Sequence, residues 1–184
     1  MGDSATSRTG SCVCGAVQVR IQGKPLEMHL CHCSTCQKFS GSVFGAYVTV
    51  QDPQLTITVK PGHDEESTLK RYKEPPKASG NVNERTFCGI CSSQVACRNT
   101  SLPIMVIVPL GILEPYPSSG GGAAGTEGQE GDAADDVWNS KPTIEYWCER
   151  KRSWVGETGA ELVLKRQPEL DEEVAKLKKI FGME

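Results

Sequence analysis

Seven of the nine cysteines in this chain fall into three short clusters, and these clusters constrain the fold more than any other feature. The clusters are Cys12-x-Cys14, Cys31-x-Cys33-x-x-Cys36 and Cys88-x-x-Cys91. The number of cysteines is odd and residues 1–10 show no apolar signal segment, which argues against a disulfide framework. Metal binding or thiol redox chemistry explains the clusters better. We therefore expect a reducing compartment, the cytoplasm, with the nucleus as the alternative.

The spacing within the clusters is typical of zinc ligands. Two cysteines on a tight turn can direct both sulfurs to one tetrahedral ion, and zinc suits an all-thiolate ligand set. Gly15 and Gly89 each follow a cysteine directly and allow the backbone to turn sharply there. The pairs at 12–14 and 88–91 complete one closed four-thiolate site, which would clamp two distant parts of the chain. The triplet at 31–36 then supplies three ligands and leaves a fourth position open, as in catalytic zinc sites.

Alternating apolar residues predict a mainly β domain. Patterns of period 2 occur at residues 17–21, 44–50, 55–59 and 144–148, and residues 104–108 read as a buried strand. Within 44–50, one face of the strand is expected to carry Phe44, Ala46, Val48 and Val50. Two cysteines outside the clusters, Cys97 and Cys148, are expected to be buried thiols on strands.

The sequence is read as one domain with a short leader and a helical tail. Residues 1–10 are expected to be disordered and 11–166 to form the zinc-binding domain. Inside it, 117–136 is rich in Gly and Ala and carries five acids, which predicts a flexible loop. Residues 167–184 predict a C-terminal helix with a periodic apolar face, made of Leu170, Val174, Leu177 and Phe181. We expect this helix to pack on the sheet or on a partner chain, as in a homodimer.

Charge and hydropathy bear on the class of partner. A formal net charge of −3 and a pI of about 5.7 argue against a general nucleic-acid binder, which needs a basic surface. No apolar run approaches the ~20 residues that cross a bilayer, so no membrane partner is expected. A small molecule or another protein is the expected partner.

The order of these motifs resembles the glutathione-dependent formaldehyde-activating enzymes, a family that shares its domain with centromere protein V. The resemblance lies within residues 11–98 and rests on "CVCGAV", "CHCSTCQKFSGS" and "RTFCGICSS". It implies an Mss4-like β-tent of short antiparallel sheets around two zinc ions, with the predicted helix at its C-terminus. It assigns a structural zinc to Cys12, Cys14, Cys88 and Cys91. It assigns a catalytic zinc to Cys31, Cys33 and Cys36.

The family activity joins glutathione and formaldehyde through a carbon–sulfur bond, or cleaves that bond. The chain departs from the family pattern at two places. Ser92 stands where the family usually has a glycine, which bears on the second cysteine turn. The loop at 117–136 is an insertion, which would bear on substrate choice if it lies near the site.

We hypothesise a zinc-dependent carbon–sulfur lyase-like enzyme. A substrate thiol such as glutathione would occupy the open position of the triplet and attack, or leave from, a carbonyl carbon. Lys38 is a candidate to offset the negative charge of the site or to bind a substrate carboxylate, and Ser42 to contact the substrate. A solvent-facing lysine and a simple turn are the alternatives. His32 is weighed as a proton carrier, and Arg85 as a carboxylate ligand or a partner in a structural salt bridge.

Two other functions compete with this hypothesis. A zinc-stabilised module that binds a protein would have its triplet metal capped or buried. A thiol redox enzyme of related fold, such as a methionine sulfoxide reductase, would need a reactive cysteine outside the structural pair, and Cys97 is the candidate.

Overall fold

The computed structural model describes residues 7–75, 82–114, 138, 140–166, 171, 172, 175, 176 and 179. Eleven strands form within these residues: β1 (Arg8–Ser11), β2 (Val17–Ile21), β3 (Glu27–Cys31), β4 (Gly45–Gln51), β5 (Leu55–Val59), β6 (Leu69–Lys73), β7 (Asn83–Cys88), β8 (Gln94–Asn99), β9 (Met105–Pro109), β10 (Ile144–Tyr146) and β11 (Leu162–Leu164). The helical elements are short: α1 (Ser34–Ser40), α2 (Glu65–Thr68), η2 (Asp52–Gln54), η3 (Leu110–Ile112) and η5 (Cys148–Arg150). The prediction of a mainly β protein is confirmed.

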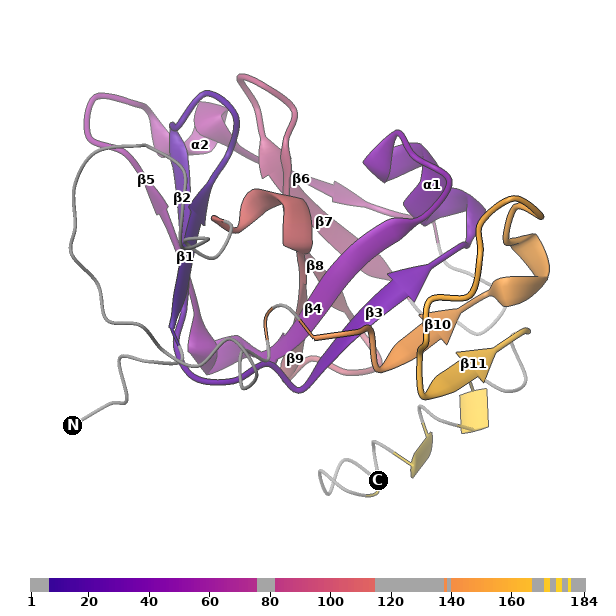
Figure 1. Ribbon diagram of the computed structural model, residues 1–184. Helices are drawn as coiled ribbons and strands as arrows, with labels where there is room; N and C mark the ends of the chain where they lie inside the picture. Colours follow the sequence, from indigo (N-terminus) through magenta and orange to yellow (C-terminus); the bar gives the residue numbers. More distant parts are fainter. Residues whose placement is uncertain are drawn as a thin grey trace, which may run out of the picture.

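The strands form two sheets. One has the order β1-β2-β5, and the other has the order β11-β10-β3-β4-β9-β8-β7-β6. Figure 1 shows the small sheet on one side of the molecule and β10 and β11 on the other. Most neighbours are antiparallel, but β10 runs parallel to both β3 and β11. The expectation of antiparallel sheets is wrong at β10, because neither of its neighbours, β3 and β11, is joined to it by a tight hairpin.

The main core lies between the two sheets. In β2 the burial alternates strictly, with Val17, Val19 and Ile21 inside and the residues between them exposed. These side chains belong to the same buried cluster as Val48 and Val50 of β4 and the valines of β8 and β9. The period-2 pattern of the sequence therefore marks the inner face of β2, as expected for a sheet covered on one side.

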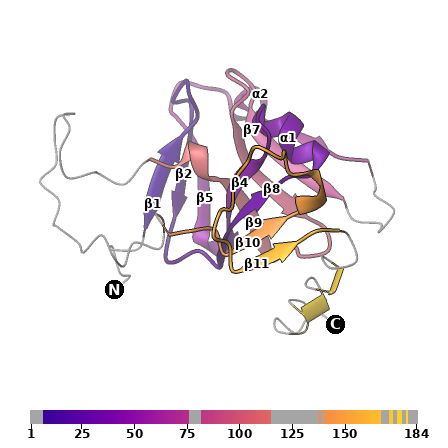
Figure 2. The same ribbon diagram turned by 45° about the vertical axis from the view of Figure 1, so that its right-hand side comes forward.

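Strand β4 lies between β3 and β9 inside the large sheet, and its side chains are buried on both faces because each face packs into a different cluster. Its valines enter the main core, whereas Tyr47 enters a second, smaller cluster with Cys31 and Cys36. The helix α1 follows β3 and brings Cys36 into this second cluster. Figure 2 shows α1 beside the large sheet and away from the strands of the small sheet. The triplet is therefore built on the opposite face of β4 from the main core.

Several expectations about the chain ends and single residues can be compared with these elements. β1 begins at Arg8, so ordered structure starts before the expected boundary at residue 10; residues 1–6 lie outside the described residues. The loop at 117–136 also lies outside them. In the tail, residues 171, 172, 175, 176 and 179 are helical and exposed, while the apolar positions of the predicted helix are not described. Among the described helices, none combines the length and apolar character needed to cross a membrane.

Candidate metal centres and the pocket between them

In the fold, the cysteine pairs at 12–14 and 88–91 come together as one group, the first cysteine cluster. It joins the turn after β1 to the turn between β7 and β8. All nine cysteines lie in the described residues, and none forms a disulfide. The sulfur atoms of four cysteines lie within 4.8 Å of one another: Cys12, Cys14, Cys88 and Cys91. The Sγ atoms of Cys12 and Cys14 are 3.5 Å apart, and those of Cys14 and Cys88 are 3.7 Å apart. Four sulfurs at about 2.3 Å around a tetrahedral ion would be about 3.8 Å from one another, so these residues fit zinc.

Both turns of this cluster have the geometry of zinc knuckles. After Cys12, Gly15 takes a φ of 75° and its N–H donates to the carbonyl of Cys12 at 2.8 Å. The N–H of Val17 donates to the Cys12 sulfur at 3.2 Å. In the second turn, Ser92 takes a φ of 62° and its N–H donates to the carbonyl of Cys88 at 2.8 Å. Ser92 thus keeps the left-handed turn that a glycine adopts more readily.

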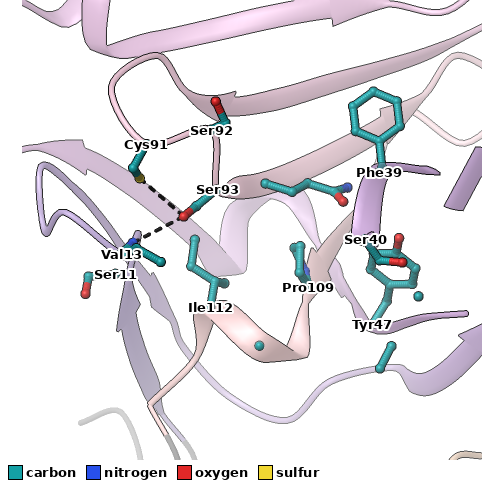
Figure 3. Close-up of a pocket in the computed structure, with 14 residues that line it drawn as sticks. Ser11, Val13, Phe39, Ser40, Tyr47, Cys91, Ser92, Ser93, Pro109 and Ile112 are labelled. Carbon is teal, nitrogen blue, oxygen red and sulfur yellow. Dashed lines mark hydrogen bonds between the residues drawn. The ribbon is translucent and has the colours of Figure 1, made fainter. Parts of the chain in front are cut away.

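Hydrogen bonds at the second turn favour a thiolate. The sulfur of Cys91 lies 3.3 Å from the hydroxyl of Ser93, which also accepts the N–H of Val13 at 3.2 Å (Figure 3). Burial raises the pKa of Cys91, but hydrogen bonds with the side chain and backbone of Ser93 lower it to about 5. This sulfur is therefore prepared to bind a cation at neutral pH.

The second cysteine cluster is local in sequence. Cys31 ends β3, Cys33 is the N-cap of α1, and Cys36 lies inside that helix. The N–H of Cys36 donates to the sulfur of Cys33 at 3.3 Å, and the three sulfurs lie within 4.8 Å of one another. Contact with the sulfurs of Cys33 and Cys36, together with burial, raises the pKa of Cys31 well above its usual value. Three such thiols become thiolates together only beside a cation, so the triplet also fits a bound metal ion.

Arg85 supplies a fixed positive charge next to the triplet. Its side chain is buried, its Nε donates to the buried carboxylate of Glu74, and its terminal nitrogen lies 3.9 Å from the sulfur of Cys36. The guanidinium also stacks 4.3 Å over the ring of Phe39 from α1. The structural salt bridge that was one of the two roles expected for Arg85 is present, with Glu74 as the partner. The guanidinium additionally lies where it can offset thiolate charge.

His32 belongs to a third group of side chains. Its ring is fully buried, and its Nε2 lies 2.7 Å from a carboxylate oxygen of Glu145. Glu145 also accepts from Lys151 at 3.0 Å and from Thr158 at 3.2 Å. Burial raises the pKa of Glu145, but the hydrogen bonds from His32 and Lys151 lower it below its usual value. His32, Glu145 and Cys148 have ligand atoms within 4.8 Å of one another, but the ammonium of Lys151 already supplies the cation there.

A pocket of about 420 Å³ lies between the two cysteine clusters. Figure 3 shows Cys91, Ser92 and Ser93 on one side of it and Phe39, Ser40 and Tyr47 on the other. The cysteines of the triplet do not themselves line the pocket, but Tyr47 packs on Cys31 and Cys36 and lines the pocket as well. Tyr47 is 2% exposed, and its hydroxyl has no hydrogen-bond partner among the described residues. Tyr47 therefore connects the triplet to the pocket.

The remaining sequence candidates lie apart from this pocket. Lys38 is exposed on the last turn of α1, and Ser42 is exposed in the turn that follows. Cys97 is buried on β8 as expected, and burial counts against a reactive redox thiol. Cys148 was expected on a strand, but it lies in η5 and is only partly buried, because the strand ends at Tyr146 and Trp147 turns to a φ of 61°.

The family model for glutathione-dependent formaldehyde-activating enzymes matches residues 7–123, well over half of the chain. The chain belongs to this family. The matched region contains both cysteine clusters and every described residue that lines the pocket between them. The resemblance drawn from the sequence motifs is thereby confirmed.

Two further proteins are similar over part of the chain. An uncharacterized lyase of Schizosaccharomyces pombe (strain 972) is 29% identical over 84 residues, which make up 46% of this chain. The chain spans about half of that relative, 52% of its length. A crystal structure of a Rhodobacter sphaeroides protein has a TM-score of 0.45 at 21% identity, covering 59% of this chain and 89% of that one. A structural likeness at this level carries no argument about function.

Three residues near the candidate centres, Tyr47, Glu74 and Glu145, are not marked by any motif of the sequence. Tyr47 alternates with the apolar face expected for residues 44–50, and a strand buried on both faces gives no polar–apolar contrast to mark it. Glu74 and Glu145 follow or lie in short strands far from the cysteines in sequence, and only the fold brings them to Arg85 and His32. The available signal was Gly45, because a glycine inside a strand often marks the place where another group packs closely against the backbone, and here that group is the ring of Tyr47.

Proposed function

We propose that this protein is a zinc-dependent carbon–sulfur lyase-like enzyme that joins a thiol to a small carbonyl compound, or cleaves the product. Membership of the family and the lyase name of the Schizosaccharomyces pombe relative support an enzyme of this class. Glutathione is the proposed thiol and formaldehyde the proposed carbonyl compound, in line with the description of the family. The protein would act in the cytoplasm, with neither a nucleic acid nor a membrane as partner.

The observation that carries the proposal is the triplet with its charge environment. Cys31, Cys33 and Cys36 offer three sulfurs to one point, and the guanidinium of Arg85 lies beside them. Three ligands leave a tetrahedral ion with one position for a substrate. Zinc bound there would supply a cation that keeps thiols deprotonated at neutral pH. The four-cysteine cluster would hold a second, structural zinc, with all four positions taken by protein.

The residues around the triplet would prepare it for a substrate thiol. Arg85 offsets the negative charge that three thiolates place in a buried site, and Glu74 holds the guanidinium in that position. Cys33 caps α1, so the helix backbone fixes the spacing to Cys36. Lys38 and Ser42 are exposed at the end of α1, where they would meet only a substrate long enough to extend along that helix. A compact domain at 11–166 with a helix at 167–184 and a homodimer remain part of the proposal.

The direct test is zinc stoichiometry by native mass spectrometry, combined with an assay for S-hydroxymethylglutathione made from glutathione and formaldehyde. The wild type should bind two zinc ions per chain, and Cys33→Ser should bind one and lose the activity. Cys148→Ser is the matched control, because Cys148 lies outside both cysteine clusters, and it should keep both ions and the activity. One zinc in the wild type, or activity that survives Cys33→Ser, would contradict the proposed site.

A further inference from the structure

The hydroxyl of Tyr47 is a buried polar group that the fold leaves without a partner. The side chain is almost fully enclosed, and no described nitrogen or oxygen accepts its hydrogen bond; its polar neighbour is the sulfur of Cys36, a weak acceptor. A buried hydroxyl without a partner is unfavourable, and proteins retain one where a ligand or a bound water satisfies it. The fold also reserves space for this group, because a side chain at Gly45 would overlap the hydroxyl and the ring edge beside it. In the register of β3 and β4, Gly45 lies opposite Cys31.

The pocket beside Tyr47 combines apolar and polar side chains and has no acidic or basic residue among those described. Its lining includes four serines and Gln94, and its one sulfur, that of Cys91, belongs to the proposed structural zinc site. The side-chain nitrogen of Gln94 is likewise buried without a hydrogen-bond partner. Two donors without acceptors favour a ligand that brings oxygen atoms. A carboxylate is not favoured, because Arg85, the nearby cation, is already paired with Glu74.

We propose that this pocket holds the uncharged, oxygen-bearing carbon of the substrate, and that Tyr47 donates a hydrogen bond to its oxygen. This inference rests on the proposed function. In the forward direction the substrate thiol adds to the aldehyde: the carbon–sulfur bond forms, the carbonyl π bond breaks, and the proton lost by the thiol reaches the oxygen from solvent. Tyr47 is not consumed, and it stabilises the oxygen as negative charge develops on it.

Tyr47 can act as the donor at neutral pH, because a phenol has an ordinary pKa of about 10 and therefore keeps its proton. The carboxylates of a glutathione-like thiol would have to lie outside this neutral pocket. The pocket therefore distinguishes substrates by the group attached to sulfur, and a hydroxymethyl group is favoured over a methyl group of similar size.

The competing role for Tyr47 is support of the triplet through its contact with Cys36. In that case removing the hydroxyl would weaken metal binding, whereas the proposal predicts weaker binding of the ligand and an unchanged zinc content. Tyr47→Phe removes only the unpartnered hydroxyl and keeps the ring over Gly45. Tyr146→Phe is the matched control, because Tyr146 packs against the same cluster but directs its hydroxyl to Glu27 at 3.4 Å.

The experiment compares two S-substituted glutathiones that differ by one hydroxyl, the hemithioacetal S-hydroxymethylglutathione and the thioether S-methylglutathione, by isothermal titration calorimetry on the zinc-loaded protein. Zinc per chain is measured on each variant by native mass spectrometry. Tyr47→Phe should weaken binding of the hydroxymethyl compound about twofold to tenfold, the range for one hydrogen bond. Binding of the methyl compound and the zinc content should not change. Tyr146→Phe should match the wild type in all three measurements.

The outcomes separate this inference from the proposed function. If the wild type binds glutathione and both S-substituted compounds, and Tyr47→Phe changes the dissociation constant of neither compound, the role of Tyr47 is refuted and the proposed function stands. Loss of zinc in Tyr47→Phe would assign the hydroxyl to the triplet and overturn the inference as well. If the wild type binds neither glutathione nor either S-substituted compound, the proposed function fails. Gln94→Met provides a second variant, which should also weaken binding of the hydroxymethyl compound without changing binding of the methyl compound.

Discussion

Replacing Gly45 with alanine tests how the protein seats Tyr47 against the cysteine triplet. The added methyl group would overlap the hydroxyl and two ring carbons of Tyr47, where carbon atoms normally stay about 3.5–4.0 Å apart. The ring has little room to move, because Tyr47 is buried and packs on Cys31 and Cys36. Overpacking of this kind costs about 1–3 kcal/mol in the free energy of unfolding. For a protein of this size that corresponds to a fall in Tm of about 2–12 °C.

The measurement is differential scanning calorimetry with urea unfolding, at one fixed zinc concentration because a bound metal shifts apparent stability. Gly111→Ala is the matched control. Gly111 lines the same pocket, but a methyl group there would meet no atom within 4 Å. Its stability should stay the same or rise by about 0.4–1 kcal/mol, as less conformational freedom is lost on folding. Equal stability of Gly45→Ala and Gly111→Ala would show that the ring of Tyr47 is not held against Gly45.

Two further predictions follow from the backbone and from a buried carboxylate. Ser92→Gly should stabilise the protein by about 0.5–1 kcal/mol in urea unfolding. The change removes the cost of a left-handed backbone conformation at a residue with a Cβ, about 1–2 kcal/mol, and adds a chain-entropy cost of about 0.5–1 kcal/mol. Ser92→Ala keeps the Cβ and should not change the stability. Glu145→Gln should destabilise by roughly 1.5–3 kcal/mol at pH 7. Because the folded pKa of Glu145 is lowered, its contribution is fully present above its unfolded value near 4.5 and is lost as pH falls through the folded value. The difference between wild type and Glu145→Gln in urea should therefore shrink below about pH 4.5, and a difference that grows there would contradict the assignment.

The alternation of apolar residues was enough to predict most strands. It located β2 and β5 and the inner faces they present, because those strands border solvent on one side. It could not describe β4, where both faces are covered and Tyr47 and Thr49 are as buried as the valines. It placed Cys148 on a strand, which is wrong because Trp147 breaks the extended conformation. A parallel partner for β3 was equally out of reach, since pairing across a long connection leaves no local pattern.

The cysteines of the two clusters could be identified from the sequence alone. Spacing within a turn is a local property, so Cys12 with Cys14, Cys88 with Cys91, and the triplet at 31–36 could each be recognised along the chain. The surroundings of these cysteines depend on how the strands pack. Arg85 reaches Cys36, and Tyr47 reaches a neutral pocket bounded by the other cluster, because β4 and β7 belong to one twisted sheet. Contacts between residues distant in sequence depend on the packing of whole strands, and no short stretch of sequence records them.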